Sequence, residues 1–153
     1  MNTLALDLGT RCGWAIGTTA NGAASGTWDL APAKQRRFEG AGMKWLRLRS
    51  FIDDVYRMQR FERVVIEEVR RHLGVDAAHA YGGALAVVSE WCEANKVPYS
   101  GVPVATIKKH ATGKGNAKKD AMIAAAEARG WKPGDDNEAD ALWLLAATLE
   151  GGA

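Results

Sequence analysis

Residues 4–10 read Leu-Ala-Leu-Asp-Leu-Gly-Thr, an apolar run that carries an acid and is then closed by a glycine. Residues 64–67, Val-Val-Ile-Glu, repeat this arrangement far along the chain, and a third acid, Asp140, lies at the start of the last amphipathic segment. Carboxylates are costly to bury unless they are paired or bound to a metal ion, and neighbouring carboxylates raise one another's pKa. Because a divalent cation removes this penalty, Asp7, Glu67 and Asp140 predict a metal-dependent enzyme.

Length and composition limit the class of protein. A chain of 153 residues, 47% of them hydrophobic, favours one domain over residues 1–153 with a proper core. No apolar run reaches the roughly 20 residues of a membrane helix, and no basic region precedes a long apolar stretch as in a signal peptide. Cys12 and Cys92 fit no metal-ligand spacing and are typical of free thiols in a reducing compartment. We therefore expect a cytoplasmic protein without a membrane partner.

The charge is unevenly distributed. The net charge of +2 is too small to indicate a nucleic-acid partner by itself. However, basic residues gather in two regions, residues 34–63 and 108–119, whereas acids gather at residues 135–140. A basic surface around an acidic hollow suits a metal nuclease, because cations bind phosphates and acids bind the metal. For any single Lys or Arg, an ordinary solvated helix face remains the alternative.

Hydrophobic periodicity and turn residues predict the elements. Five strands are expected, over residues 3–8, 13–19, 25–30, 63–68 and 97–104. Helices are expected over residues 35–60, 77–95, 104–110, 117–129 and 137–150. The first three strands form an antiparallel meander, and alternating helices and strands follow. This order predicts an α/β fold with a mixed five-stranded sheet and helices on both faces.

Four segments carry a family resemblance. They are residues 6–15 (Leu-Asp-Leu-Gly-Thr-Arg-Cys-Gly-Trp-Ala), 65–69 (Val-Ile-Glu-Glu-Val), 112–119 (Thr-Gly-Lys-Gly-Asn-Ala-Lys-Lys) and 139–142 (Ala-Asp-Ala-Leu). In this order and spacing they resemble the RuvC family of Holliday junction resolvases, which are ribonuclease H-like nucleases, and especially its small phage-type members. The resemblance covers most of the chain. It implies a ribonuclease H-like fold, a structure-selective endonuclease that nicks junctions in symmetric pairs, and a bacteriophage origin with activity in the bacterial host cytoplasm.

The acids predict the type of metal ion. Asp7, Glu67 and Asp140 are expected to hold two Mg²⁺ ions about 3.5–4 Å apart, and no nucleotide cofactor is expected. Mg²⁺ suits oxygen ligands, Mn²⁺ should substitute, and Zn²⁺ is disfavoured because no His or Cys cluster is present. Adjacent strand residues face opposite sides, so only one of Glu67 and Glu68 can join Asp7, and the family motif selects Glu67.

The fourth ligand has two candidates. The family usually has an acid or a histidine three residues before its last Asp, and this position is Asn137 here. Asn offers a carbonyl oxygen but no charge. Asp136, one residue earlier, shares a helix face with Asp140 unless it lies outside the helix and caps it. Glu138 is expected to point elsewhere, so Asp136 and Asn137 remain equal candidates.

Basic residues are expected to contact DNA. Lys119 matches the family's lysine near the scissile phosphate, where a cation stabilises charge or orients water. The other expected DNA contacts are Arg11, Arg70, Arg71, Lys114 and Lys118. Just after the Glu, well-known bacterial resolvases place a base-stacking aromatic, and the comparable stretch here is residues 69–72, Val-Arg-Arg-His. Arg binds phosphate and stacks on bases, so branch-point binding is expected, but sequence-specific cutting is in doubt.

Other aromatic residues are expected in the core. Trp45, Trp91 and Trp143 fall at apolar helical positions, where packing explains them better than base stacking. A Holliday junction has near two-fold symmetry, and paired nicks need two active sites, so the resemblance also implies a homodimer. The Ala- and Gly-rich helix over residues 77–95 is the expected interface.

Competing interpretations share parts of the pattern. A YqgF-like nuclease has the same fold and a similar first motif, although residues 65–68 and 139–142 favour RuvC. An actin-like ATPase or sugar kinase has a phosphate loop that resembles residues 7–10, but it needs two such domains. A junction-binding protein with a degenerate active site is a further alternative, which Asn137 keeps open.

Overall fold

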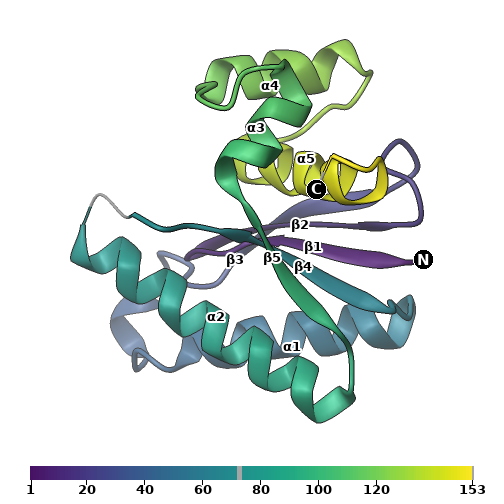
Figure 1. The fold of residues 1–153 in the computed structure, drawn as a ribbon. Helices are drawn as coiled ribbons and strands as arrows, with labels where there is room; N and C mark the ends of the chain where they lie inside the picture. Colours follow the sequence, from purple (N-terminus) through teal and green to yellow (C-terminus); the bar gives the residue numbers. More distant parts are fainter. Residues whose placement is uncertain (72–73, 153) are drawn as a thin grey trace.

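A mixed five-stranded sheet, with strand order β3-β2-β1-β4-β5, forms the centre of the molecule (Figure 1). The structure is a computed structural model that describes residues 1–71 and 74–152. The strands are β1 (Thr3–Asp7), β2 (Arg11–Gly17), β3 (Ala24–Asp29), β4 (Arg63–Glu68) and β5 (Tyr99–Pro103). The first three pair in antiparallel fashion, whereas β4 runs parallel to both β1 and β5. The expected α/β fold with a mixed five-stranded sheet is therefore confirmed.

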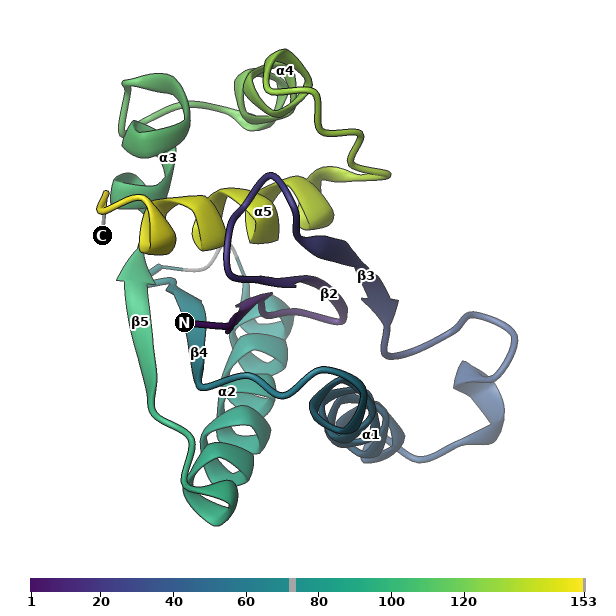
Figure 2. The same ribbon diagram turned by 90° about the vertical axis from the view of Figure 1, so that its right-hand side faces the viewer.

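Helices cover both faces of this sheet. One face carries α1 (Met43–Met58) and α2 (Val75–Asn95), as Figure 2 shows. The other carries α5 (Asp136–Leu149), with α3 (Val104–Thr112) and α4 (Lys119–Ala128) packed on its outer side. Within the described residues, none of these helices has the length and apolar character needed to cross a membrane.

The expected helix over residues 35–60 is divided in the structure. A short 3-10 helix, η1 (Arg36–Phe38), is followed by a break, and α1 begins only at Met43. Gly40 and Gly42 lie in this break, and each glycine disfavours a helix by about 1 kcal/mol relative to alanine. Phe38 therefore does not join the apolar helix face and is 76% exposed.

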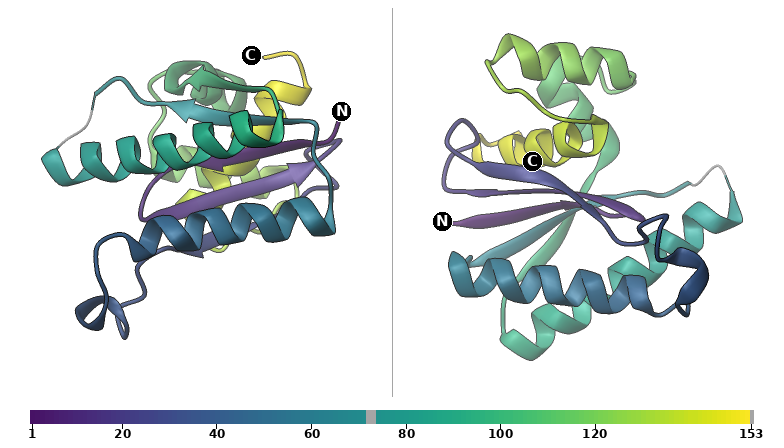
Figure 3. Two further views of the ribbon diagram at one scale, coloured as in Figure 1. Left: turned by 90° about the horizontal axis from the view of Figure 1, so that it is seen from below. Right: turned by 180° about the vertical axis from the view of Figure 1, so that it is seen from behind.

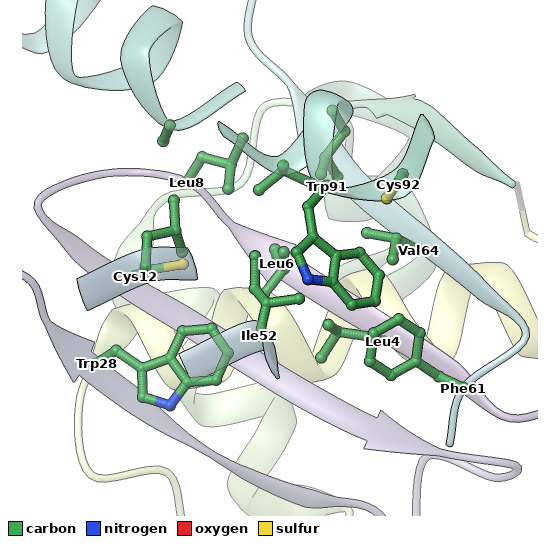
Figure 4. Close-up of a cluster of buried hydrophobic side chains, with 14 of the residues drawn as sticks. Leu4, Leu6, Leu8, Cys12, Trp28, Ile52, Phe61, Val64, Trp91 and Cys92 are labelled. Carbon is green, nitrogen blue, oxygen red and sulfur yellow. The ribbon is translucent and has the colours of Figure 1, made fainter. Parts of the chain in front are cut away.

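The core between the sheet and helices α1 and α2 is built on alternating strand residues. Leu4 and Leu6 of β1 face this layer, together with Val64 of β4 and Trp91 of α2 (Figure 4). Trp91 is only 4% exposed, and its indole N–H donates to Asp53 Oδ1 at 2.7 Å. The expected core positions of Trp45, Trp91 and Trp143 are confirmed, since Trp45 packs against this core and Trp143 is buried in the other.

The second core lies between the sheet and α5. Ala5 of β1 and Val65 of β4 point to this side and meet the apolar residues of α5, among them Leu142 and Leu145. Because α3 and α4 cover its outer side, α5 is buried on almost every face (Figure 3). The small side chains at the sheet surface let α5 approach closely. Packing on both sides therefore holds α5 at a defined height above the strands.

Two further expectations concern the state of the two cysteines and the surface of α2. Cys12 and Cys92 are buried free thiols. Helix α2 buries Ala84 and Val88 toward the core and leaves Gly82 and Ala86 exposed. Its expected role in a homodimer interface stays a prediction.

Candidate metal centre

Three carboxylates meet at the edge of the sheet where β1 and β4 end. Asp7 is the last residue of β1, Glu67 lies near the end of β4, and Asp140 lies in the second turn of α5. One oxygen of each carboxylate lies within 4.8 Å of the other two. Parallel pairing of Leu6 with Ile66 puts the following residues, Asp7 and Glu67, side by side. The topology thus joins two strand ends, and α5 supplies the third acid from above.

Glu68 does not join this group. Its side chain lies against Gly101 of β5, and Arg70 Nε donates to it at 3.5 Å. Glu67 and Glu68 therefore point to opposite sides, as strand geometry requires. The sequence-based choice of Glu67 as the neighbour of Asp7 agrees with this arrangement.

Glycine at position 13 allows α5 to reach the sheet. Gly13 of β2 pairs with Asp7 of β1. A Cβ built on Gly13 would lie 1.9 Å from the backbone carbonyl oxygen of Asn137, in the first turn of α5. Any side chain here would have to displace that turn. Gly13 therefore sets the distance between the first turn of α5 and the strand that carries Asp7.

Hydrogen bonds fix the start of α5. Asp135 is the N-cap, because its side chain accepts from the Glu138 backbone N–H at 2.9 Å. The Thr27 hydroxyl on β3 donates to the same carboxylate at 2.7 Å, and Arg11 on β2 donates at 3.2 Å. Asp136 is therefore the first residue of the helix and is not its cap.

Glu138 also helps to anchor the start of α5 to the sheet. The Ser25 hydroxyl on β3 donates to its carboxylate at 2.7 Å, and the Gly134 backbone N–H donates at 2.8 Å. As expected, Glu138 points away from Asp140. The two acids that anchor the helix, Asp135 and Glu138, are thus distinct from the three that converge on the sheet edge.

Burial and neighbouring negative charge disfavour the ionised forms of Asp7 and Asp140. Burial raises the pKa of Asp7 well above its ordinary value, and the charges of Glu67 and Asp140 raise it further. Burial, followed by the charges of Glu67 and Asp136, raises the pKa of Asp140 to about 7. A cluster of hard oxygen donors with excess negative charge fits a divalent cation such as Mg²⁺ or Mn²⁺.

Asp136 lies on the margin of the cluster. Its charge raises the pKa of both Asp7 and Asp140. Its carboxylate also forms an ion pair with Lys119, with 3.2 Å between Nζ and Oδ2. Asn137 is half-buried, and its backbone rests against Gly13.

Two lysines partly offset the negative charge. Lys108 on α3 and Lys119 on α4 both lower the pKa of Asp140, opposing its burial. The sequence predicts Lys119 near this site but gives Lys108 no role of its own. Membership of the basic region 108–119 is the sequence signal that could have pointed to Lys108. The packing of α3 on α5 brings the charge of Lys108 close enough to Asp140 to lower its pKa.

The remaining expected DNA contacts lie outside the cluster. Arg11 is bound to Asp135 and also lies 3.8 Å from Asp29, so it braces α5. Arg70, with its side chain 80% exposed, and Arg71 follow β4 at the same edge of the sheet. Lys114 and Lys118 are exposed between α3 and α4. None of these four side chains belongs to the carboxylate cluster.

Comparison with solved structures identifies the fold. Thermus thermophilus RuvC in complex with Holliday junction substrate aligns with a TM-score of 0.78 and 22% identity, over 100% of this chain and 98% of that chain. This chain has the RuvC fold. Thermus thermophilus RuvC in a second structure aligns with a TM-score of 0.72, also at 22% identity and over 100% and 98% of the two chains.

A eukaryotic protein shares the RuvC fold. The yeast mitochondrial Holliday junction resolvase Ydc2 aligns with a TM-score of 0.66 and 8% identity, over 98% of this chain and 78% of its own. Neither a protein-family model nor a curated protein sequence matches the chain. The ribonuclease H-like fold implied by the sequence resemblance is thereby confirmed.

Proposed function

We propose that this chain is a divalent-metal-dependent endonuclease that resolves Holliday junctions and cuts related branched DNA. The observation that carries the proposal is the convergence of Asp7, Glu67 and Asp140 within 4.8 Å at one edge of a RuvC fold. Buried acids that repel one another persist when a cation compensates them. The similar proteins named as resolvases give the substrate class, four-way DNA.

Asp7, Glu67 and Asp140 would hold two Mg²⁺ ions, and Mn²⁺ would replace them. We prefer Asp136 to Asn137 as the fourth ligand, since it brings a negative charge within reach of both Asp7 and Asp140. When bound, the two ions activate a water molecule and stabilise the leaving 3′ oxygen. All contributing protein atoms are carboxylate oxygens, the ligands that these ions prefer.

The lysines would position and neutralise the scissile phosphate. Lys119 forms an ion pair with Asp136 at 3.2 Å, and the charge of Lys108 on α3 acts on Asp140. Ammonium groups placed in advance stabilise the charge that develops on the phosphate as it reacts. In this proposal both lysines act on the transition state and contribute less to overall DNA affinity.

Other cations would bind DNA away from the reacting phosphate. Lys114 and Lys118 would contact the backbone from the α3–α4 loop, while Arg70 and Arg71 would lie at the branch point. Arg11 would contribute through the part of its side chain that is exposed, 56%, while it braces α5. Cutting at two symmetric positions would require a homodimer, and the exposed face of α2 is the proposed interface.

A second candidate function is junction binding without cutting. It is favoured by Asn137, which stands where resolvases of this type usually carry an acid or a histidine. A YqgF-like nuclease of the same fold is a variant of the main proposal with another substrate. Both alternatives make different predictions for cutting of four-way DNA.

One experiment separates these functions. Purified protein is incubated in Mg²⁺ with labelled four-way junction, linear duplex and single-stranded DNA. We expect paired nicks near the branch point, which Asp7→Asn, Glu67→Gln or Asp140→Asn abolishes while junction binding persists. Asp120→Asn, an exposed acid on α4, is the matched control and should cut normally. Binding without nicks would support the second candidate, and cutting of linear DNA alone would refute junction resolution.

A further inference from the structure

The segment that leads from β3 into the first turn of α1 carries positive charge that no described residue neutralises in an ion pair. Residues 31–44, hereafter the basic arm, hold four cations that form no ion pair with any described residue: Lys34, Arg36, Arg37 and Lys44. Its single acid, Glu39, is bound by Arg47 at 2.5 Å. Figure 2 shows the arm projecting from the body of the molecule beyond α1.

Arg47 of α1 holds the arm in a defined shape. Its guanidinium donates to the Leu30 carbonyl at 2.8 Å and to Gln35 Oε1 at 2.8 Å, in addition to Glu39. Arg36 in turn donates to the Ala31 carbonyl at 3.0 Å. The arm is therefore ordered before any ligand binds, which lowers the entropic cost of binding.

An exposed aromatic lies at the tip of this arm. Phe38 is 76% exposed, and the Arg37 guanidinium stacks over its ring at 4.7 Å from the centroid. A flat apolar ring on a segment that carries cations without ion-pair partners among the described residues has the chemistry of a nucleic-acid contact, because the ring stacks on bases or sugars while the cations bind phosphates.

Three hollows follow one another from the arm past the ends of β1 and β4. The first, about 280 Å³, is lined by Arg36 and Lys44 of the arm and by Thr10, three residues beyond Asp7. The second, about 350 Å³, shares Thr10 and reaches Val69, which follows β4. The third, about 400 Å³, shares Val69 and is lined by residues 70–71. The second hollow is lined by Leu8 and the third by Glu68, the residues that follow Asp7 and Glu67, so the row passes beside the metal centre without including its carboxylates.

We propose that this row of hollows is the path of one DNA strand, whose phosphates are bound by Arg36 and Lys44 of the basic arm. The arm lies on the β3 side of the metal centre, and Arg70 and Arg71 lie on the β5 side. Cations therefore line both ends of the row, and the residues that follow Asp7 and Glu67 lie between them. The inference rests on the proposed function and adds a duplex-arm contact that is remote from the branch point.

The test compares two pairs of charge removals on the full chain. Arg36→Gln with Lys44→Gln removes two arm cations, and Arg57→Gln with Arg60→Gln removes two exposed cations from the other end of α1. Affinity for a four-way junction is measured by fluorescence anisotropy in EDTA at several salt concentrations. Each lost phosphate contact lowers the slope of log affinity against log salt by about 0.9, so the arm pair should lower it by about 2. The control pair should leave it unchanged.

Two further measurements guard against indirect effects. Phe38→Ala, at an exposed position, should weaken binding without changing the salt slope. Junctions with arms too short to reach residues 31–44 should abolish the difference between wild type and the Arg36→Gln, Lys44→Gln pair. An unchanged salt slope in the arm pair, while wild-type protein binds and cuts junctions, would overturn the inference and leave the proposed function intact. Wild-type protein that neither binds nor cuts junctions would overturn both.

Discussion

Gly13 and Asn137 are in direct backbone contact across the interface between β2 and α5. A Cβ on Gly13 would lie 1.9 Å from the Asn137 carbonyl oxygen, and backbone atoms at this position cannot rotate away. Gly13 is also the strand partner of Asp7. The contact therefore links the position of the helix that carries Asp140 to the strand that carries Asp7.

Gly13→Ala should therefore separate the carboxylates. We expect α5 to shift outward, cutting to fall at least tenfold, and unfolding to become easier by about 1–3 kcal/mol, as in other overpacked sites. Gly42→Ala is the control, because a Cβ there meets no atom within 4 Å and the backbone φ of −75° suits alanine. Cutting rate and denaturant unfolding measure the two effects. Wild-type cutting by the Gly13→Ala protein would show that this contact does not set the site geometry.

Asp7 and Asp140 predict an unusual pH dependence of the metal-free protein. The pKa values of both carboxyl groups are raised in the fold, that of Asp140 to about 7, so their protonated forms are favoured there. The stabilising contribution is thus complete below the unfolded pKa of about 4 and is lost as pH rises through about 7. In EDTA we expect the melting temperature to fall by several degrees between pH 5 and pH 8.

Two changes should remove this fall. The Asp140→Asn protein has no ionisable group at this position, so its melting temperature should vary less between pH 5 and pH 8. Mg²⁺ at 100 times its dissociation constant should restore about 2.7 kcal/mol at pH 8 by binding only the folded state. A melting temperature that rises with pH in EDTA would contradict the mutual repulsion of these acids.

Lys108 should matter for cutting more than its exposed neighbour. Lys108 and Lys119 are the cations that lower the pKa of Asp140, whereas Lys109 is exposed on the same helix. We expect Lys108→Ala to slow single-turnover cutting about 100-fold, the effect of removing one oxyanion-stabilising group. Lys109→Ala should have little effect, and junction affinity should change little in either variant. Equal rates for Lys108→Ala and Lys109→Ala would exclude a specific role for Lys108.

The two acids at the strand ends could be predicted because the signal for each lies within a few neighbouring residues. An acid that closes an apolar run is visible in the sequence, and parallel neighbours bring such ends together, which places Asp7 beside Glu67. The role of Arg11 was not visible in this way. Its partners Asp29 and Asp135 come from a hairpin neighbour and from a helix far along the chain. Only the packed structure brings those three charges together.

The break before α1 shows the opposite limitation. Apolar spacing continues through residues 35–60 with a helical period, but Gly40 and Gly42 interrupt the helix. Periodicity reports which face an element would bury and does not weigh the backbone entropy of two glycines. The interruption leaves Arg36, Arg37 and Phe38 exposed outside α1, whereas the apolar pattern alone would have placed them on one continuous helix.

The fourth metal ligand can be assigned by comparing Asp136 with Asn137. Asp136 lies one helical turn before Asp140 and its charge acts on both Asp7 and Asp140, whereas Asn137 is uncharged and rests against Gly13. We expect Asp136→Asn to raise the Mg²⁺ concentration for half-maximal cutting about 10–100-fold, a typical cost of weakening a metal site. Asn137→Ala should raise it less. Because Asp136→Asn also releases Lys119, the variant Lys119→Ala is the control. It should slow cutting at saturating Mg²⁺ without a comparable change in the Mg²⁺ requirement. A larger Mg²⁺ requirement for Asn137→Ala than for Asp136→Asn would assign the ligand to Asn137 instead.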